Sequence, residues 1–257
     1  MLDPEHLIQR LQAAAADRQV EILYACESGS RAWDLASTDS DYDLRFIYRH
    51  PREWYLSLHP GRDLIGPIKE NDGELDMVGW DVRKFLFHLA SSNPSVLEWL
   101  NSPIHYYQEG SFLSDCQRLA DDCFRPRKAI AHYLGIAHGA RQSGLGEDNL
   151  WNLKKFCYWM RPILAATYVA RHESRPPITM EALLQLLEDD SMIAAVNQLM
   201  ELKSTVREDH RMRIDPHLMT HLMEMKTRAT AACNGMDKVQ TDPEAADAFF
   251  RQTSGWV

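Results

Sequence analysis

Two aspartates separated by one residue are the part of this sequence best suited to chemistry. Asp41 and Asp43 stand at the start of an apolar run, 44–48, whose residue types favour a β-strand. Because alternate residues of a strand share a face, we expect both carboxylates on one side of a sheet. Two carboxylates about 4 Å apart repel by roughly 4 kcal/mol at an effective dielectric constant of about 20. A divalent cation removes this repulsion, so the pair predicts a metal site.

The acidic segment 39–43 has two simpler interpretations. It matches the start of an EF-hand calcium loop, but such a loop requires glycine at its sixth position and glutamate at its twelfth. Those two positions hold Leu44 and His50, which excludes the calcium loop. A turn in which Asp39 and Ser40 cap backbone groups remains the alternative for this segment taken alone.

The motif as a whole has a family likeness. Gly-Ser at 29–30 followed by Ser-Asp-x-Asp at 40–43 resembles the signature of the DNA polymerase β-like nucleotidyltransferase superfamily. Together with 27–33 and 79–86, it looks like the branch of predicted bacterial and phage nucleotidyltransferases associated with RNA repair. The likeness is specific over about residues 20–105. It implies an α+β fold, with a small mixed β-sheet nucleotidyltransferase (palm-like) domain followed by an all-helical C-terminal domain.

The resemblance also implies which residues act. Asp41, Asp43 and Asp76 would be catalytic and would bind two Mg²⁺ ions, with Mn²⁺ as an alternative metal. Asp76 would complete the second metal site and accept the proton of the attacking hydroxyl group. Asp81 is the competing third carboxylate, although its position suits the N-cap of a helix. Nucleotidyl transfer needs in-line geometry and charge cancellation, for which hard oxygen ligands are well suited.

Residues around the glycine turn are expected to bind the nucleotide. They are Gly29, Ser30, Arg31 and Ser40. Backbone N–H groups and a hydroxyl group of such a turn would face the terminal phosphates. Arg31 would contact a phosphate or pair with Glu27, and we expect Trp33 to pack rather than to hold a base. Asp34 stands where the superfamily usually has glycine, and an acid there is expected to alter the turn or its phosphate affinity.

A basic segment supplies a second group of expected nucleotide contacts. Residues 125–171 hold 8 Lys or Arg against 2 Asp or Glu, whereas residues 1–110 hold 10 against 18. The expected contacts are Lys154, Lys155, Tyr158 and Arg161. On a helix, Lys154, Tyr158 and Arg161 share one face, which suits a triphosphate and a base. The alternative, an exposed helix face with solvated cations, has equal weight.

Composition indicates the class of protein. A chain of 257 residues with 45% hydrophobic residues, 25% charged residues and a net charge of −9 is typical of a soluble globular protein. No stretch approaches the roughly 18 apolar residues of a membrane span, and residues 1–5 do not resemble a secretory signal. We therefore expect a cytoplasmic protein with no membrane partner. The five cysteines include no Cys-x-x-Cys pair, so neither disulfides nor a zinc knuckle is indicated.

Apolar spacing and turn residues predict the elements that position these groups. A helix over 4–16 should precede a strand over 20–26. A hairpin over 63–80 should turn at Asn71-Asp72-Gly73 and carry Asp76 on its second strand. Helices should begin at Asp81 and Asn93. Further helices are predicted at 111–122, 126–142, 148–171, 179–201 with a break near 189–190, 216–232 and 242–252.

These expectations combine into one functional hypothesis. A catalytic domain, 1–108, would precede a helical domain, 109–257, which closes the nucleotide and acceptor cleft. The protein would move a nucleoside monophosphate from an NTP to a hydroxyl acceptor, an RNA end by resemblance, and release pyrophosphate. Two alternatives stay open: adenylylation of a protein or small molecule, and a catalytically silent nucleotide- or RNA-binding module. Silent members usually lose an acidic ligand, and here all three candidates are present.

Overall fold

The computed structural model describes residues 3–37, 40–70, 73–239 and 243–255. The chain forms two compact units. The first unit consists of Met1–Ala32, Ser40–Cys123 and Gln240–Val257, and the second consists of Trp33–Asp39 and Phe124–Val239. Compactness does not test where an independently folding domain ends, so the boundaries 1–108 and 109–257 stay a prediction.

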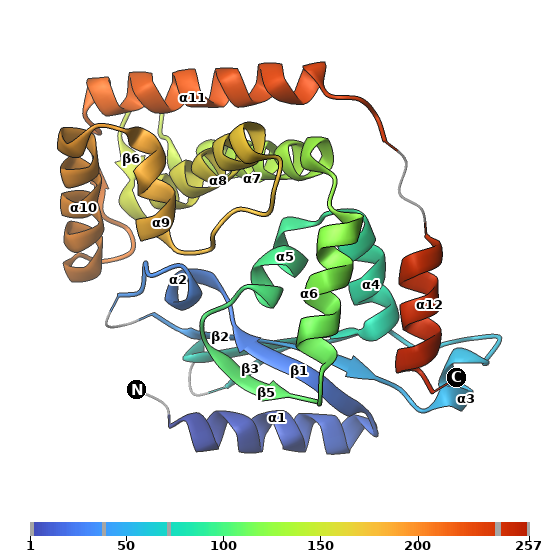
Figure 1. The fold of residues 1–257 in the computed structure, drawn as a ribbon. Coiled ribbons are helices and arrows are strands. Elements are labelled where there is room, and N and C mark those ends of the chain that lie inside the picture. The colour runs from blue at the N-terminus through green and yellow to red at the C-terminus, as the bar shows by residue number, and fades with distance from the viewer. Residues whose placement is uncertain (1–2, 38–39, 71–72, 240–242, 256–257) are drawn as a thin grey trace. The chain divides into compact units, whose positions relative to one another are not determined.

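A five-stranded mixed sheet lies at the centre of the first unit, in the order β3-β4-β2-β1-β5 (Figure 1). The strands are β1 (Glu21–Glu27), β2 (Tyr42–Arg49), β3 (Leu64–Glu70), β4 (Leu75–Asp81) and β5 (His105–Gln108). Strands β2 and β4 are parallel, whereas the other neighbouring strands are antiparallel. The expected first strand and hairpin are therefore present. Asn71 and Asp72 of the expected hairpin turn lie outside the described residues.

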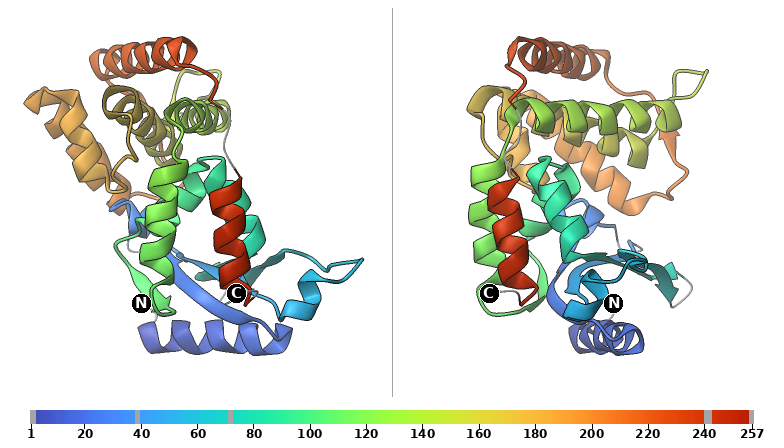
Figure 2. Two further views of the ribbon diagram at one scale, coloured as in Figure 1. Left: turned by 45° about the vertical axis from the view of Figure 1, so that its right-hand side comes forward. Right: turned by 90° about the vertical axis from the view of Figure 1, so that its right-hand side faces the viewer.

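Helices cover both faces of this sheet (Figures 1 and 2). Helix α1 (Pro4–Arg18) lies along one face, and its Leu7 and Leu11 pack in one apolar cluster with Leu44 and Phe46 of β2. The opposite face carries α4 (Val82–Ala90), α5 (Pro94–Leu100), α6 (Phe112–Cys123) and α12 (Glu244–Thr253). Two short helices, α2 (Gly29–Ala32) and α3 (Arg52–Tyr55), follow β1 and β2 respectively.

Local capping explains where several of these helices begin. The Asp81 carboxylate accepts the Arg83 N–H at 2.8 Å at the start of α4. The Asn93 side chain accepts the Ser95 N–H at 2.9 Å at the start of α5. Side chains of this kind satisfy N–H groups that the first helical turn leaves without partners. Both predicted helix starts are confirmed.

The second unit is mostly helical. Its helices are α7 (Pro126–Gly144), α8 (Leu153–His172), α9 (Met180–Leu184), the 3₁₀ helix η2 (Gln185–Leu187), α10 (Asp190–Thr205) and α11 (Pro216–Gly235). Apolar residues of α7, α8 and α11 form its core, with Phe156 and Trp159 of α8 fully buried. It also holds a two-stranded antiparallel sheet of β6 (Trp151–Asn152) and β7 (Arg211–Met212). The predicted helix over 148–171 thus begins only after β6.

The fold class is α+β, as predicted: a mixed sheet with its helices is followed by a mostly helical region. Among the described residues, none of the helices combines the length and the apolar character that crossing a membrane requires.

Candidate active site

Asp43 and Asp76 lie side by side on the parallel strands β2 and β4, where they are register partners. Buried and partly exposed residues alternate along both strands, and Tyr42, Leu44, Leu75 and Met77 belong to the cluster under α1. Because side chains alternate between faces, Asp43 and Asp76 share the face of the sheet opposite α1. Each of the two aspartate side chains is 20% exposed.

Arg45 lies between the two carboxylates. Its Nη2 donates to Oδ1 of Asp43 at 2.7 Å and to Oδ2 of Asp76 at 3.2 Å, and its Nη1 donates to the Asp76 carbonyl oxygen at 2.8 Å. The guanidinium therefore offsets the repulsion between two half-buried acids. The sequence analysis missed Arg45. Its spacing of two residues from Asp43 on a strand, which places it on the same face, was the available signal.

The Asp76 carboxylate has an oxygen that makes no hydrogen bond within the described part of the chain. Oδ1 of Asp76 is buried and has no hydrogen-bond partner among the described residues. A buried carboxylate oxygen in that state is costly for a protein, and a divalent cation is a ligand that would satisfy it. Asp43 and Asp76 thus fit a hard cation by donor type. Within the described part of the chain, however, no three His, Cys, Asp or Glu residues form a ready-made metal cluster.

Asp41, the third predicted ligand, lies just before β2, which begins at Tyr42, and is exposed. Its charge nevertheless acts on the site. Burial raises the pKa of Asp43, the Arg45 guanidinium lowers it, and the charges of Asp41 and Asp76 raise it again, with a net upward effect. The three aspartates are therefore electrostatically coupled through Asp43.

The glycine turn packs directly on this acidic pair. Gly29 has φ +63°, and a Cβ atom added there would overlap Oδ2 of Asp43. Both the left-handed backbone and the close approach require glycine. The Ser28 N–H donates to the Asp43 carbonyl oxygen at 2.9 Å, and Ser30 is buried in α2. The turn that should face phosphate groups is thus attached to β2 beside Asp43.

Arg31 joins the turn to the residues before β2. Its Nη2 donates to the Ser40 carbonyl oxygen at 2.8 Å and its Nε to the Asp41 carbonyl oxygen at 3.1 Å. The guanidinium carbon lies 3.8 Å from the centroid of the Tyr42 ring. The structure therefore brings the predicted residues Arg31, Ser40 and Asp41 together. Asp39, the first residue of the acidic segment, lies outside the described residues.

Glu27 is a buried acid that the sequence analysis included in the motif 27–33 and considered as an alternative partner for Arg31, without a role at Asp43. Its Oε1 accepts the Asp43 N–H at 2.8 Å, and its Oε2 accepts the Tyr106 hydroxyl group. Burial raises the pKa of Glu27 to about 7, against the lowering effect of these two hydrogen bonds. An acid at the end of the apolar run 20–26 was the signal for it. Glu27 fixes the backbone of Asp43.

Comparison with known proteins identifies the family. A family model described as RlaP, "RNA repair pathway DNA polymerase beta family", matches residues 4–252. The chain belongs to the RlaP family. As an RlaP protein, it is a member of a DNA polymerase β-like nucleotidyltransferase family linked to RNA repair, as the motif predicted.

A curated protein and a solved structure are among the matches to this RlaP chain. It is 37% identical over 214 residues to YcgL, an uncharacterized protein of Bacillus subtilis (strain 168), a match covering 82% of this chain and 81% of YcgL. A crystal structure of a nucleotidyltransferase-like protein from Exiguobacterium sibiricum 255-15 aligns with a TM-score of 0.35 and 13% identity. That alignment covers 96% of this chain and 80% of the other.

The second group of predicted contacts in this RlaP chain lies on α8, within the second unit. Arg161 is buried, and its Nη2 donates to the Ile178 carbonyl oxygen at 2.9 Å. Its guanidinium carbon lies 4.2 Å from the centroid of the Trp33 ring, which also meets the Tyr158 ring edge-on. Trp33 thus packs, as expected. Arg161 and Tyr158 fix this tryptophan, and their contact with a nucleotide stays a prediction.

The two lysines of this group differ from each other. Lys154 pairs with Glu208, and Lys155 is exposed on α8.

Asp34, which stands where the superfamily usually has glycine, has φ +61°. A left-handed backbone explains why glycine is usual there, and aspartate tolerates that conformation better than most residues do.

Proposed function

We propose that this protein is a divalent-metal-dependent nucleotidyltransferase that transfers a nucleoside monophosphate from an NTP to a hydroxyl group at an RNA end, with release of pyrophosphate. The observation that carries the proposal is the register pair Asp43 and Asp76, with Oδ1 of Asp76 buried and lacking a hydrogen bond among the described residues. Membership of a family linked to RNA repair supports RNA as the acceptor.

In this proposal Asp43 and Asp76 hold the cation, and Asp41 is the remaining ligand. When bound, Mg²⁺ would neutralise phosphate charge and orient the groups that react. Arg45 already offsets part of the negative charge of Asp43 and Asp76. The phosphates of an NTP are the acceptors that its guanidinium would bind when those carboxylates turn to the cation.

The remaining residues of the first unit position the reactants. The backbone N–H groups around Gly29 and Ser30 would bind the terminal phosphates, because such turns present several N–H groups to one anion. Asp76 is the proposed acceptor for the proton of the attacking hydroxyl group, since its Oδ1 makes no hydrogen bond with the described residues. Glu27 and Arg31 keep the segment 40–43 in place through the hydrogen bonds described above.

The experiment that tests this function follows label from each α-³²P-labelled NTP into separate acceptor pools. With Mg²⁺ and RNA ending in a 3′-hydroxyl group, we expect label in RNA that is lengthened, and none when the end carries a 3′-phosphate. Label confined to a protein or to small molecules would overturn the RNA acceptor. Absence of label in every pool, alongside measurable NTP binding, would favour a catalytically silent module.

A further inference from the structure

Lys203, on α10 of the second unit, is a lysine that is only 7% exposed. Its Nζ donates to the Leu35 carbonyl oxygen at 2.7 Å and to Oγ of Ser37 at 3.0 Å. Both acceptors belong to residues 33–37, which we call the connecting segment. Burying an ammonium group costs free energy that burying an apolar side chain of similar length does not. What the lysine supplies at this position is therefore its hydrogen bonds to the connecting segment.

The connecting segment is held by other helices of the second unit as well. The Met180 N–H of α9 donates to the Trp33 carbonyl oxygen at 2.9 Å, and the guanidinium carbon of Arg161 on α8 lies 4.2 Å from the centroid of the Trp33 ring. Leu35 is 4% exposed and belongs to the same apolar core as α7, α8 and α11. The connecting segment is thus built into the core of this unit, which is unusual for a connection between two elements.

Both ends of the connecting segment continue directly into the candidate active site. Helix α2, which carries Gly29 and Ser30, ends at the residue before it. Residues 38–39 lie outside the described part of the chain, and Ser40 and Asp41 follow them. Arg31 joins the two ends, because it donates to the carbonyl oxygens of both Ser40 and Asp41. A displacement of the connecting segment therefore acts through the peptide chain on the glycine turn and on the acidic residues.

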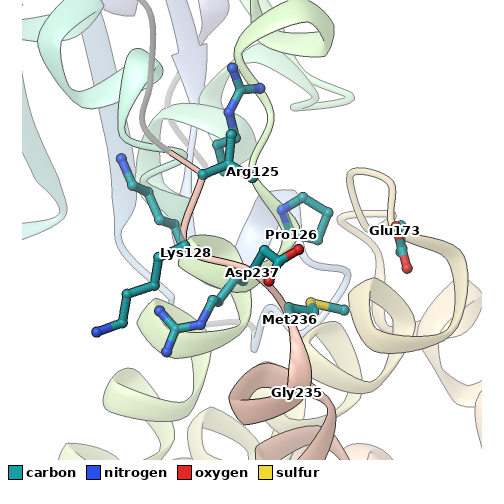
Figure 3. Close-up of a pocket in the computed structure, with 10 residues that line it drawn as sticks. Arg125, Pro126, Lys128, Glu173, Gly235, Met236 and Asp237 are labelled. Carbon is teal, nitrogen blue, oxygen red and sulfur yellow. The ribbon is translucent and has the colours of Figure 1, made fainter.

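A cavity in the same unit is separate from this arrangement. Figure 3 shows it where α7 begins and α11 ends. Among the described residues that line it, none is Lys203 or part of the connecting segment. Met236 lines this cavity and packs against the apolar core. A substitution at Met236 therefore disturbs the second unit and leaves the ammonium group of Lys203 and its two acceptors in place.

We propose that Lys203 is a positioning residue that, through the connecting segment, keeps the turn at Gly29 and Ser30 and the residues 40–43 in the conformation that binds an NTP. The role in NTP binding rests on the proposed function. Backbone N–H groups bind an anion best when they are ordered beforehand, because order that has to be gained on binding lowers affinity. Lys203 acts on the NTP only through the chain.

The variants for the test remove the hydrogen bonds in steps. Lys203→Met removes the ammonium group and keeps a side chain of similar length. Ser37→Ala removes one of the two acceptors, leaves the bond to the Leu35 carbonyl oxygen, and serves if Lys203→Met unfolds. Met236→Ala is the control for a general loss of stability in the second unit. Denaturant unfolding of each variant shows that it is folded and gives its loss of stability.

The main readout is amide hydrogen exchange of the full chain, without NTP or metal. We expect residues 28–32 and 40–43 to exchange at least about tenfold faster in Lys203→Met, because a hydrogen bond from a charged donor contributes a factor of this size to a local equilibrium. Ser37→Ala should give a smaller increase at the same residues, and Met236→Ala none. Faster exchange confined to residues 33–37, or an equal increase in Met236→Ala, would overturn the proposal.

Steady-state transfer kinetics test the consequence for NTP binding. Lys203→Met should raise KM for the NTP by about tenfold or more and change kcat less, because the turn it positions is proposed to hold the phosphates. An unchanged KM would overturn the role in NTP binding. If the wild type transfers no nucleotide, the proposed function fails, and hydrogen exchange still decides whether Lys203 positions the turn.

Discussion

At the scale of single residues, three neighbours stabilise the acidic pair Asp43 and Asp76, each through a different interaction. Arg45 donates hydrogen bonds to the carboxylates of Asp43 and Asp76 and offsets part of their negative charge. Glu27 accepts the Asp43 N–H, and Gly29, which has no Cβ, leaves space for the Asp43 carboxylate. Burial raises the pKa of Asp43, so its ionised form depends on these neighbours. A change in any of them should therefore affect the site before it affects the rest of the fold.

Replacing Gly29 by alanine should damage both stability and transfer. A residue with Cβ in a left-handed backbone costs about 1–2 kcal/mol, and the new Cβ overlaps Oδ2 of Asp43, which has to move. Denaturant unfolding and pyrophosphate release measure the two effects. Gly139→Ala in α7 is the control, because a Cβ there meets nothing within 4 Å and should stabilise the helix by up to about 1 kcal/mol. Full activity of Gly29→Ala would contradict the assigned packing.

Glu27 should make stability depend on pH in a defined window. Burial raises its pKa to about 7, from an ordinary value of 4.5. The folded state therefore favours the protonated form, whose stabilisation is fully present below about pH 4.5 and is lost as the pH rises through about 7. The loss is on the order of 3 kcal/mol.

Glu27→Gln removes this titration, because the amide cannot ionise, while its oxygen can still accept the Asp43 N–H. Urea unfolding of both proteins over a pH series measures the effect. The free energy of unfolding of the wild type should fall relative to that of Glu27→Gln as the pH rises through this window. If the free energies of unfolding of the two proteins change in parallel with pH, the ionisation of Glu27 does not cause the pH dependence.

At the scale of elements, local signals in the sequence predicted helices and strands well, and pairing poorly. The starts at Asp81 and Asn93 were predictable because a side chain caps its own helix. The register that sets Asp43 beside Asp76 was not predictable from local signals, because the parallel pairing of β2 and β4 depends on contacts between residues far apart in the chain. The spacing of Arg45 places it on the same face as Asp43, but its contact with Asp76, like that of Glu27 with the Asp43 N–H, exists only once the strands pair.

Two buried tyrosines on neighbouring strands give opposite predictions. The Tyr48 hydroxyl on β2 is buried and has no hydrogen-bond partner among the described residues, whereas the Tyr24 hydroxyl on β1 donates to the Trp99 carbonyl oxygen at 2.8 Å. Tyr48→Phe should stabilise the protein by about 1 kcal/mol, and Tyr24→Phe should destabilise it by about 1–2 kcal/mol. Denaturant unfolding gives the free energy of unfolding of each variant relative to that of the wild type. Equal destabilisation would mean that the Tyr48 hydroxyl has a bound partner.

At the scale of the whole molecule, the chain returns to its first compact unit at the end. Helix α12 packs against this unit, with Phe250 against the ring of Tyr55 and Phe249 against the ring of Phe112. Nη1 of Arg49 donates to the Thr253 carbonyl oxygen at 2.7 Å. The sequence predicted this helix from its spacing, but an amphipathic face does not say which distant surface it will cover.

Phe250→Ala should therefore destabilise the first unit, although residue 250 is far along the chain. Full burial makes Phe→Ala cost about 3–5 kcal/mol, so a half-buried ring should cost about half as much. Phe87→Ala, at a ring that is 72% exposed, is the control and should change stability by less than about 0.5 kcal/mol. Denaturant unfolding gives the free energy of unfolding of each variant. Similar values for the two variants would refute the docking of α12.

The central claim is that Asp43 and Asp76, brought together by β2 and β4, are the acids that perform nucleotidyl transfer. The most direct measurement is Mg²⁺-dependent pyrophosphate release from an NTP with RNA present, for the wild type, Asp76→Asn and the control Asp63→Asn. We expect Asp76→Asn to lose about 100-fold or more, because it removes a direct ligand of a cation that contributes several kcal/mol to the reaction, and Asp63→Asn to stay near the wild-type rate. A folded Asp76→Asn protein that releases pyrophosphate as fast as the wild type would contradict the account.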